Sequence, residues 1–143
     1  MIGIIVTGHG NFATGLTSSL NLIAGFPENY EAVDFVAEDG VEELRAKLNA
    51  AMDKLHDCSG IIVFSDLAGG SPFKTAVEVK MTRSENIEVL AGTNLGMLIE
   101  ISMARGFIND LSSLSDMALN TGKDQVIKYT FTERKEEVSE DGI

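Results

Sequence analysis

Residues 60–72 read GIIVFSDLAGGSP, and this stretch decides the fold. Its first part is a continuous apolar run without the alternation of a half-exposed strand, which is typical of a strand buried on both faces of a parallel sheet. Ser71 and Pro72 follow two glycines, and a serine before a proline is a common helix start with the serine as the cap. The stretch predicts a buried strand, a turn that begins at Asp66, and a helix.

The N-terminal residues show the same order of features. Residues 1–10 read MIGIIVTGHG, in which a Gly-His-Gly turn ends an apolar run, so another buried strand is expected here. Apolar residues then recur at helical spacing at positions 12, 16, 20 and 23, and Gly25 is a suitable helix end. Residues 1–25 are thus predicted to form a first strand and helix.

The rest of the chain continues this alternation. Further strands are expected at residues 30–36, 86–91 and 125–131. Asp39 with Glu42 three residues later indicates the start of a helix whose apolar positions run from 41 to 55, and further helices are expected at 95–105 and at 111–119. This order predicts an α/β fold with one open, mainly parallel sheet, a strand order of about 2-1-3-4 and helices on both faces. We expect one domain over residues 1–132, followed by an acidic, flexible tail at 133–143.

Composition and charge restrict the possible functions. The 143 residues carry a net charge of −11, and binding to nucleic acid or to an anionic membrane would require clustered lysine and arginine instead. The single cysteine, Cys58, cannot form an internal disulfide, which favours the reducing cytoplasm. The apolar run at residues 1–6 is too short for a signal or membrane-spanning segment. We therefore expect a cytoplasmic globular protein.

The residues suited to chemistry follow the first and third strands. Ligands of an open parallel sheet bind beyond the carboxyl ends of its strands, where the strand order reverses, and here that crevice lies between these two strands. His9 and Asp66 would meet there, and a carboxylate on one ring nitrogen leaves the other free as a nucleophile. Amides and a helix N-terminus could hold a phosphoryl group without a metal or another cofactor. The residues predicted to bind phosphate are Ser71, Gly69, Gly70 and Gly10.

Each of these residues also has a purely structural interpretation. Gly-His-Gly is a weak motif, Asp66 could be only a turn residue, and Ser71 could be only a helix start. His56 stands near the end of the second helix, where a cation favours the helix dipole. The coincidence of a histidine, a carboxylate and a hydroxyl at one crevice favours phosphoryl chemistry at His9.

The motifs around these residues resemble the mannose-family enzyme IIA proteins of the bacterial phosphoenolpyruvate-dependent sugar phosphotransferase system. The resemblance covers about residues 1–131 and rests on Gly-His-Gly, on Gly-Gly-Ser-Pro after the aspartate of the third strand, and on AGTNLGMLIE at 91–100. It implies a phosphotransferase in which His9 becomes phosphohistidine. In the same resemblance Asp66 bonds the histidine ring and Ser71 lies near the phosphoryl group.

The resemblance also implies the partners. HPr would donate the phosphoryl group, a separate IIB component of a sugar permease would accept it, and contact with the membrane would occur only through IIB. The protein would be a homodimer whose subunits exchange the last strand, here about residues 125–131. Lys74 and Gly96 depart from the family pattern, and these departures concern sugar and partner specificity more than the chemistry.

Other protein classes share parts of this pattern. Histidine phosphatases need an arginine directly before the histidine, where this chain has Gly8. A receiver-like signalling module phosphorylated on Asp66 would need acidic residues after the first strand to hold magnesium, and residues 8–10 provide none. The phosphoryl-carrier subunit of dihydroxyacetone kinases shares the fold and the chemistry, so it stays open as the nearest alternative.

Overall fold

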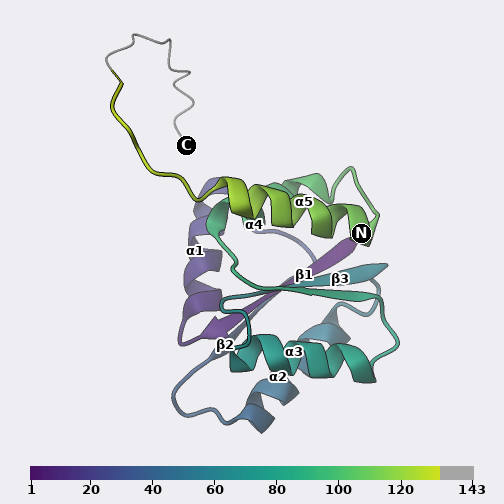
Figure 1. The fold of residues 1–143 in the computed structure, drawn as a ribbon. Helices are drawn as coiled ribbons and strands as arrows, with labels where there is room; N and C mark the ends of the chain where they lie inside the picture. The colour runs from purple at the N-terminus through teal and green to yellow at the C-terminus, as the bar shows by residue number, and fades with distance from the viewer. Residues whose placement is uncertain (133–143) are drawn as a thin grey trace.

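A four-stranded sheet with helices on both faces organises the chain (Figure 1). The computed structural model describes residues 1–132. The strands are β1 Ile2–His9, β2 Tyr30–Phe35, β3 Gly60–Ser65 and β4 Ile87–Leu90, and the helices are α1 Phe12–Ala24, α2 Val41–Lys54, α3 Ser71–Thr82, α4 Leu95–Ala104 and α5 Leu111–Asp124. All three strand pairs are parallel and the order is β2-β1-β3-β4, which confirms the predicted fold class. Within residues 1–132, no helix has the length and apolarity that crossing a membrane requires.

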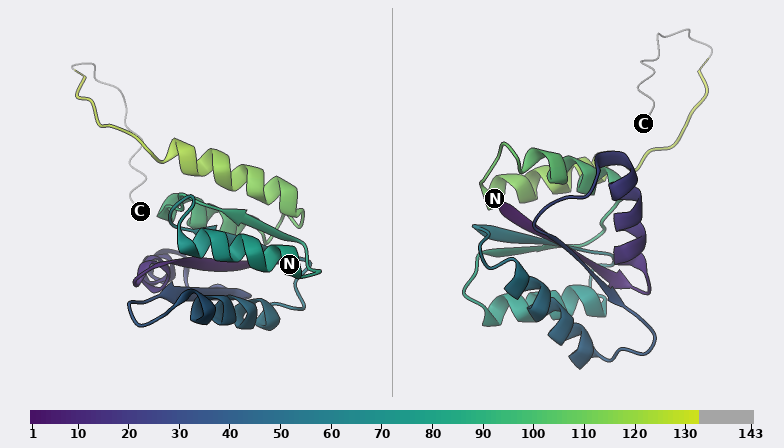
Figure 2. Two further views of the ribbon diagram at one scale, coloured as in Figure 1. Left: turned by 60° about the horizontal axis from the view of Figure 1, so that its bottom comes forward. Right: turned by 180° about the vertical axis from the view of Figure 1, so that it is seen from behind.

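Different helices cover the two faces of the sheet. Figures 1 and 2 show α1, α4 and α5 on one face and α2 and α3 on the other. Successive strand residues point to opposite faces, so Ile4 packs with α1, α4 and α5, whereas Ile5 packs with α2 and α3. Both faces need apolar side chains, and this explains why β1 and β3 are continuous apolar runs.

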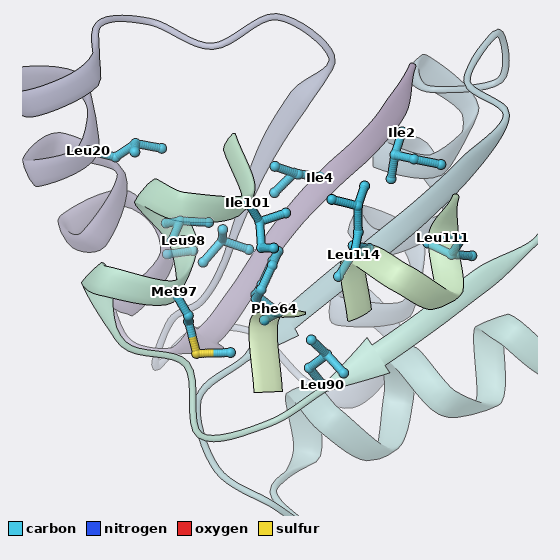
Figure 3. Packing of buried hydrophobic residues seen from close by; sticks show 14 residues of the cluster. Ile2, Ile4, Leu20, Phe64, Leu90, Met97, Leu98, Ile101, Leu111 and Leu114 are labelled. Carbon is cyan, nitrogen blue, oxygen red and sulfur yellow. The ribbon is translucent and has the colours of Figure 1, made fainter. Parts of the chain in front are cut away.

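The core on the α4 and α5 side explains one difference from the predicted helices. Phe64 of β3 is fully buried and lies among Met97, Ile101 and Leu114, as Figure 3 shows. A methyl group on Gly122 of α5 would stand 2.8 Å from Met97 Sδ, so this glycine lets α5 approach α4 closely. The helix therefore continues past the predicted end at residue 119, with a glycine inside it that serves packing.

Two helix starts also differ from prediction. Asp39 does not begin α2, because Gly40 is its N-cap and the Asp39 carboxylate instead accepts hydrogen bonds from Lys47 and from a backbone amide. Ser71 is not the cap of α3, because Gly70 occupies that position in an extended conformation. Ser71 is instead the first residue inside the helix, where its hydroxyl is not in the cap position. The serine hydroxyl is thus left for other contacts at the start of α3.

The chain leaves the body of the domain after α5 (Figures 1 and 2). Gln125 is the C-cap of α5, and residues 126–132 form neither helix nor strand. The expected last strand over 125–131 therefore does not form within the single chain, because this segment pairs with no strand of its own sheet. The acidic tail expected at 133–143 lies outside the described residues.

Candidate active site

His9 and Asp66 meet at the carboxyl edge of the sheet. His9 ends β1 and Asp66 directly follows β3, and the parallel register of these neighbouring strands pairs Thr7 with Ser65. Both side chains therefore reach the same crevice, and His9 Nδ1 lies 2.7 Å from Asp66 Oδ2. The structure thus brings the two predicted residues into direct contact.

Asp66 accepts three hydrogen bonds through both of its carboxylate oxygens, and two of them come from His9. Besides the ring contact, Oδ2 accepts the backbone N–H of His9 at 2.8 Å, and Oδ1 accepts the N–H of Leu67 at 2.8 Å. Burial of the carboxyl group raises its pKa, but these hydrogen bonds outweigh burial, so the pKa of Asp66 lies below its ordinary value. The Asp66 side chain, only 11% exposed, is therefore an ionised acceptor.

The ionised carboxylate determines the tautomer of His9. A carboxylate can only accept hydrogen bonds, so we place the ring proton on Nδ1, between the ring and Asp66. The lone pair then resides on Nε2, the ring nitrogen farther from the main chain. The His9 side chain is 46% exposed, so a partner molecule can reach the ring that carries this nitrogen.

Two further residues fix the imidazole ring. A methyl group on Gly70 would stand 3.0 Å from His9 Cε1, so the ring lies against the Gly70 backbone. The Phe35 ring meets the imidazole in an edge-to-face arrangement, with 5.9 Å between ring centroids and 61° between ring planes. Phe35 is absent from the predicted site, although β2 ends beside β1 and its register pairs Phe35 with His9. The strand order was the signal that could have identified it.

The residues predicted to bind phosphate differ in the donors that they offer. The amides of Gly10 and Gly70 already donate to backbone carbonyls, at 2.7 Å and 3.1 Å. Among residues 1–132, no acceptor meets the amides of Gly69 and Ser71. These two amides stand at the start of α3, where the helix dipole favours an anion. The amides of Gly69 and Ser71 therefore stand on either side of Gly70 in the sequence, and Gly70 is the residue that the His9 ring contacts.

The second histidine lies away from this crevice. His56 follows the C-terminal end of α2, where its Nδ1 is 2.9 Å from the carbonyl oxygen of Asp53 and its Nε2 is 3.1 Å from a carboxylate oxygen of Asp57. Both contacts are with residues close to it in sequence. In the described part of the chain, no three histidine, cysteine or acidic side chains gather as metal ligands would.

Known proteins resemble this chain over most of its length. The family model described as "PTS system fructose IIA component", where PTS denotes the phosphotransferase system, matches residues 3–119. The mannose-specific EIIAB component of the Escherichia coli K12 system is 35% identical over 125 residues, which cover 87% of this chain and 38% of that protein. The fructose-specific EIIA component of Bacillus subtilis is 26% identical over 134 residues, 90% of this chain and 91% of that protein.

Solved structures agree with these relatives. The EIIA component from Streptococcus agalactiae superimposes with a TM-score of 0.83 at 32% identity, covering 90% of this chain and 97% of that one. The mannose/sorbose-specific IIA subunit from Enterococcus faecalis also has a TM-score of 0.83, at 27% identity, covering 93% of this chain and 98% of that one. The class of protein is thus a sugar phosphotransferase component. The chain belongs to the mannose-type enzyme IIA family of the phosphotransferase system.

Proposed function

We propose that this chain is a cytoplasmic phosphoryl carrier in which His9 accepts a phosphoryl group from phospho-HPr and passes it to a IIB component of a sugar permease. The observation that carries the proposal is the 2.7 Å contact between His9 Nδ1 and Asp66 Oδ2, which orients a half-exposed ring whose Nε2 has no partner among residues 1–132. Membership of the IIA family supports the same role. The intermediate is phosphohistidine, with the phosphoryl group on Nε2.

The transfer step leaves the ring proton in place. The Nε2 lone pair of neutral His9 forms the new N–P bond, while the P–N bond of the donor phosphohistidine breaks and its electron pair returns to the donor ring. The proton on His9 Nδ1 stays in the hydrogen bond to Asp66. The negative charge of Asp66 stabilises the positive character that the ring gains as the N–P bond forms. Transfer to IIB is the same exchange with His9 as the donor.

The start of α3 holds the phosphoryl group in this proposal. Phosphoryl oxygens could accept hydrogen bonds from the amides of Gly69 and Ser71, which have no acceptor among residues 1–132. The Ser71 hydroxyl, at the first residue of α3, is a third donor. Gly10 and Gly70 contribute by allowing close approach of the backbone, since their amides already donate elsewhere. The positive end of the helix dipole adds to the stabilisation of the bound anion.

The alternative functions have less support. A receiver-like module would be phosphorylated on Asp66, but both oxygens of that carboxylate already accept hydrogen bonds from His9 and Leu67. A dihydroxyacetone kinase subunit would use the same chemistry as the proposed carrier. The relatives described above, however, are named as mannose-specific and fructose-specific components of the phosphotransferase system.

Labelling by the complete phosphorylation chain tests the proposal. The protein is incubated with phosphoenolpyruvate, enzyme I and HPr, and the phosphoryl group is mapped by mass spectrometry under conditions that preserve phosphohistidine. We expect one phosphoryl group, on His9. An unlabelled protein, or a label on Asp66, would overturn the proposal, and the second result would favour the receiver-like alternative.

Gly70→Ala is expected to slow phosphorylation of His9 about tenfold without unfolding the protein, because a misplacement of about 1 Å can cost about 100-fold in rate and a smaller shift costs less. Gly70 has φ −73° and ψ 165°, which alanine adopts without strain. Its methyl group would meet His9 Cε1 at 3.0 Å, so the ring would have to shift from its position beside Asp66. Gly106→Ala is the matched control, because its methyl group would meet only a carbonyl oxygen at 3.4 Å. Equal transfer rates in both variants would show that the Gly70 contact does not position His9.

We also propose that two copies of the chain pair by exchanging residues 125–131. The large apolar side chains of this segment are 73–84% exposed in the single chain, namely Val126, Ile127, Tyr129 and Phe131. β4 forms an open edge of the sheet, and an edge strand offers unpaired backbone donors and acceptors. Addition of the partner's segment to β4 satisfies both features at once, in a symmetric dimer.

Truncation of the chain before Gln125 is expected to abolish the dimer and to lower the thermal stability. The loss follows because the truncated chain can no longer cover β4 of its partner. Removal of residues 133–143 alone leaves the exchanged segment intact and should change neither property, which makes it the matched control. Sedimentation gives the mass of each form, and a truncated protein that remains a stable dimer would rule out the exchange.

A further inference from the structure

An apolar side chain stands at the mouth of the His9 site. Leu67 follows Asp66 directly and is 62% exposed. Its backbone is fixed on both sides, because its N–H donates to Asp66 Oδ1 at 2.8 Å and its carbonyl oxygen accepts the N–H of Gly70 at 3.1 Å. The backbone of this exposed leucine is therefore held by the same carboxylate that orients His9.

Leu67 and the His9 ring share one small surface. The position that a methyl group on Gly70 would occupy lies 3.0 Å from His9 Cε1 and 3.5 Å from Leu67 Cβ. The half-exposed ring and the exposed leucine thus both lie next to the same point beside Gly70. A molecule that covers one of them from above also approaches the other.

The geometry of transfer between two proteins makes this neighbourhood an interface. A reacting phosphorus atom must come within about 3.5 Å of Nε2 for transfer to occur. When the donor is itself a histidine on a folded protein, the protein surface around that histidine must contact the surface around His9. This step rests on the proposed function, and it brings Leu67 out of water in the complex.

We infer that Leu67 is an anchor by which a phosphohistidine-carrying protein docks, and that this partner presents its phosphohistidine from an apolar patch. Removal of an exposed leucine from water contributes favourably to binding. The two backbone hydrogen bonds of Leu67 already order its backbone before contact, so the freedom lost on docking is that of the side chain alone. An apolar anchor beside the reacting group therefore raises the affinity for the protein donor without taking part in the chemistry.

Two donors separate docking from chemistry. Phospho-HPr is the protein donor, and inorganic phosphoramidate is a small donor whose P–N bond breaks with release of ammonia as Nε2 attacks the phosphorus. Leu67→Ala is expected to raise the KM for phospho-HPr about tenfold with little change in kcat, as truncation of an interface anchor does. The rate with phosphoramidate should stay at the wild-type value. Leu22→Ala is the matched control, because Leu22 is a leucine of α1 that is 89% exposed, and it should change neither the KM for phospho-HPr nor the rate with phosphoramidate.

The outcomes distinguish this inference from the proposed function. An unchanged KM for phospho-HPr in Leu67→Ala, with wild-type protein active, would overturn the docking role alone. An equal loss of rate with phosphoramidate would also overturn it, because Leu67 would then act on His9 itself. Wild-type protein that accepts no phosphoryl group from phospho-HPr would overturn the proposed function and the docking role together.

Discussion

His9→Ala is expected to take up no phosphoryl group from phospho-HPr, whereas His56→Ala is expected to be labelled at the wild-type rate. Alanine has no lone pair with which to form the N–P bond, so the first variant loses the acceptor itself. Among residues 1–132, the hydrogen-bonding partners of His56 are Asp53 and Asp57 at the C-terminal end of α2, away from the crevice between β1 and β3. The two variants thus compare the two histidines of the chain directly.

Isolated phospho-HPr is the donor for this comparison, so that enzyme I plays no part in the measured step. The fold of His9→Ala is checked by circular dichroism and thermal unfolding. We expect it to be retained, because the ring is half-exposed and the two backbone hydrogen bonds to Asp66 do not involve it. Labelling of His9→Ala, or an equal loss in both variants, would contradict the assignment of His9 as the acceptor.

The buried strands and the place of the site could be predicted from the sequence because they depend on strong local patterns. The apolar runs at residues 1–7 and 60–65 need no alternation, since helices cover both faces of the sheet. Once the strand order is inferred, the topology itself brings His9 and Asp66 to one edge. The 2.7 Å contact between the two side chains is a consequence of that placement.

The features that escaped prediction depend on geometry that no local pattern encodes. The position of the His9 ring between Gly70 and Phe35 follows from backbone torsions and strand register. The caps predicted at Asp39 and Ser71 were displaced by neighbouring glycines, because cap preferences name suitable residue types and not the turn that the loop adopts. Residues 125–131 have strand-forming side chains but no strand partner among residues 1–132, and pairing with a second copy cannot be encoded in a local pattern.

Asp66→Asn is expected to retain the fold and to slow phosphoryl transfer to His9 on the order of 100-fold or more, as loss of a group that sets a catalytic histidine does. The carboxylate only accepts hydrogen bonds, so it keeps the ring proton on Nδ1. The NH₂ group of asparagine can donate to Nδ1 instead, which moves the ring proton onto Nε2 and blocks the attacking lone pair. The variant also lacks the negative charge that stabilises the ring during transfer.

Nitrogen NMR of labelled His9 reports the tautomer, and a single-turnover assay with phospho-HPr reports the rate. Asp34→Asn is the matched control, because β2 places Asp34 opposite Gly8 but its carboxylate bonds the amide and hydroxyl of Thr14 and not the His9 ring. It removes the same charge at the same edge and should keep both the tautomer and the rate. If Asp66→Asn transfers at the wild-type rate with its tautomer unchanged, Asp66 is only a turn residue.

The pH dependence separates the charge of Asp66 from its shape. Because its pKa in the folded protein lies below the ordinary value of about 4, Asp66 is ionised throughout the range from pH 5 to 8. A carboxyl group with a lowered pKa contributes stability that is fully present above the ordinary pKa and is lost as the pH falls through the lowered one.

Urea denaturation should therefore show the largest difference in unfolding free energy between the wild type and Asp66→Asn at pH 7. That difference should shrink below about pH 4 as the carboxylate gains a proton and, like the amide, carries no charge. A difference that is the same at pH 3 and pH 7 would mean that the hydrogen bonds of Asp66 depend on the shape of the side chain, and the tautomer argument for His9 would then lose its basis.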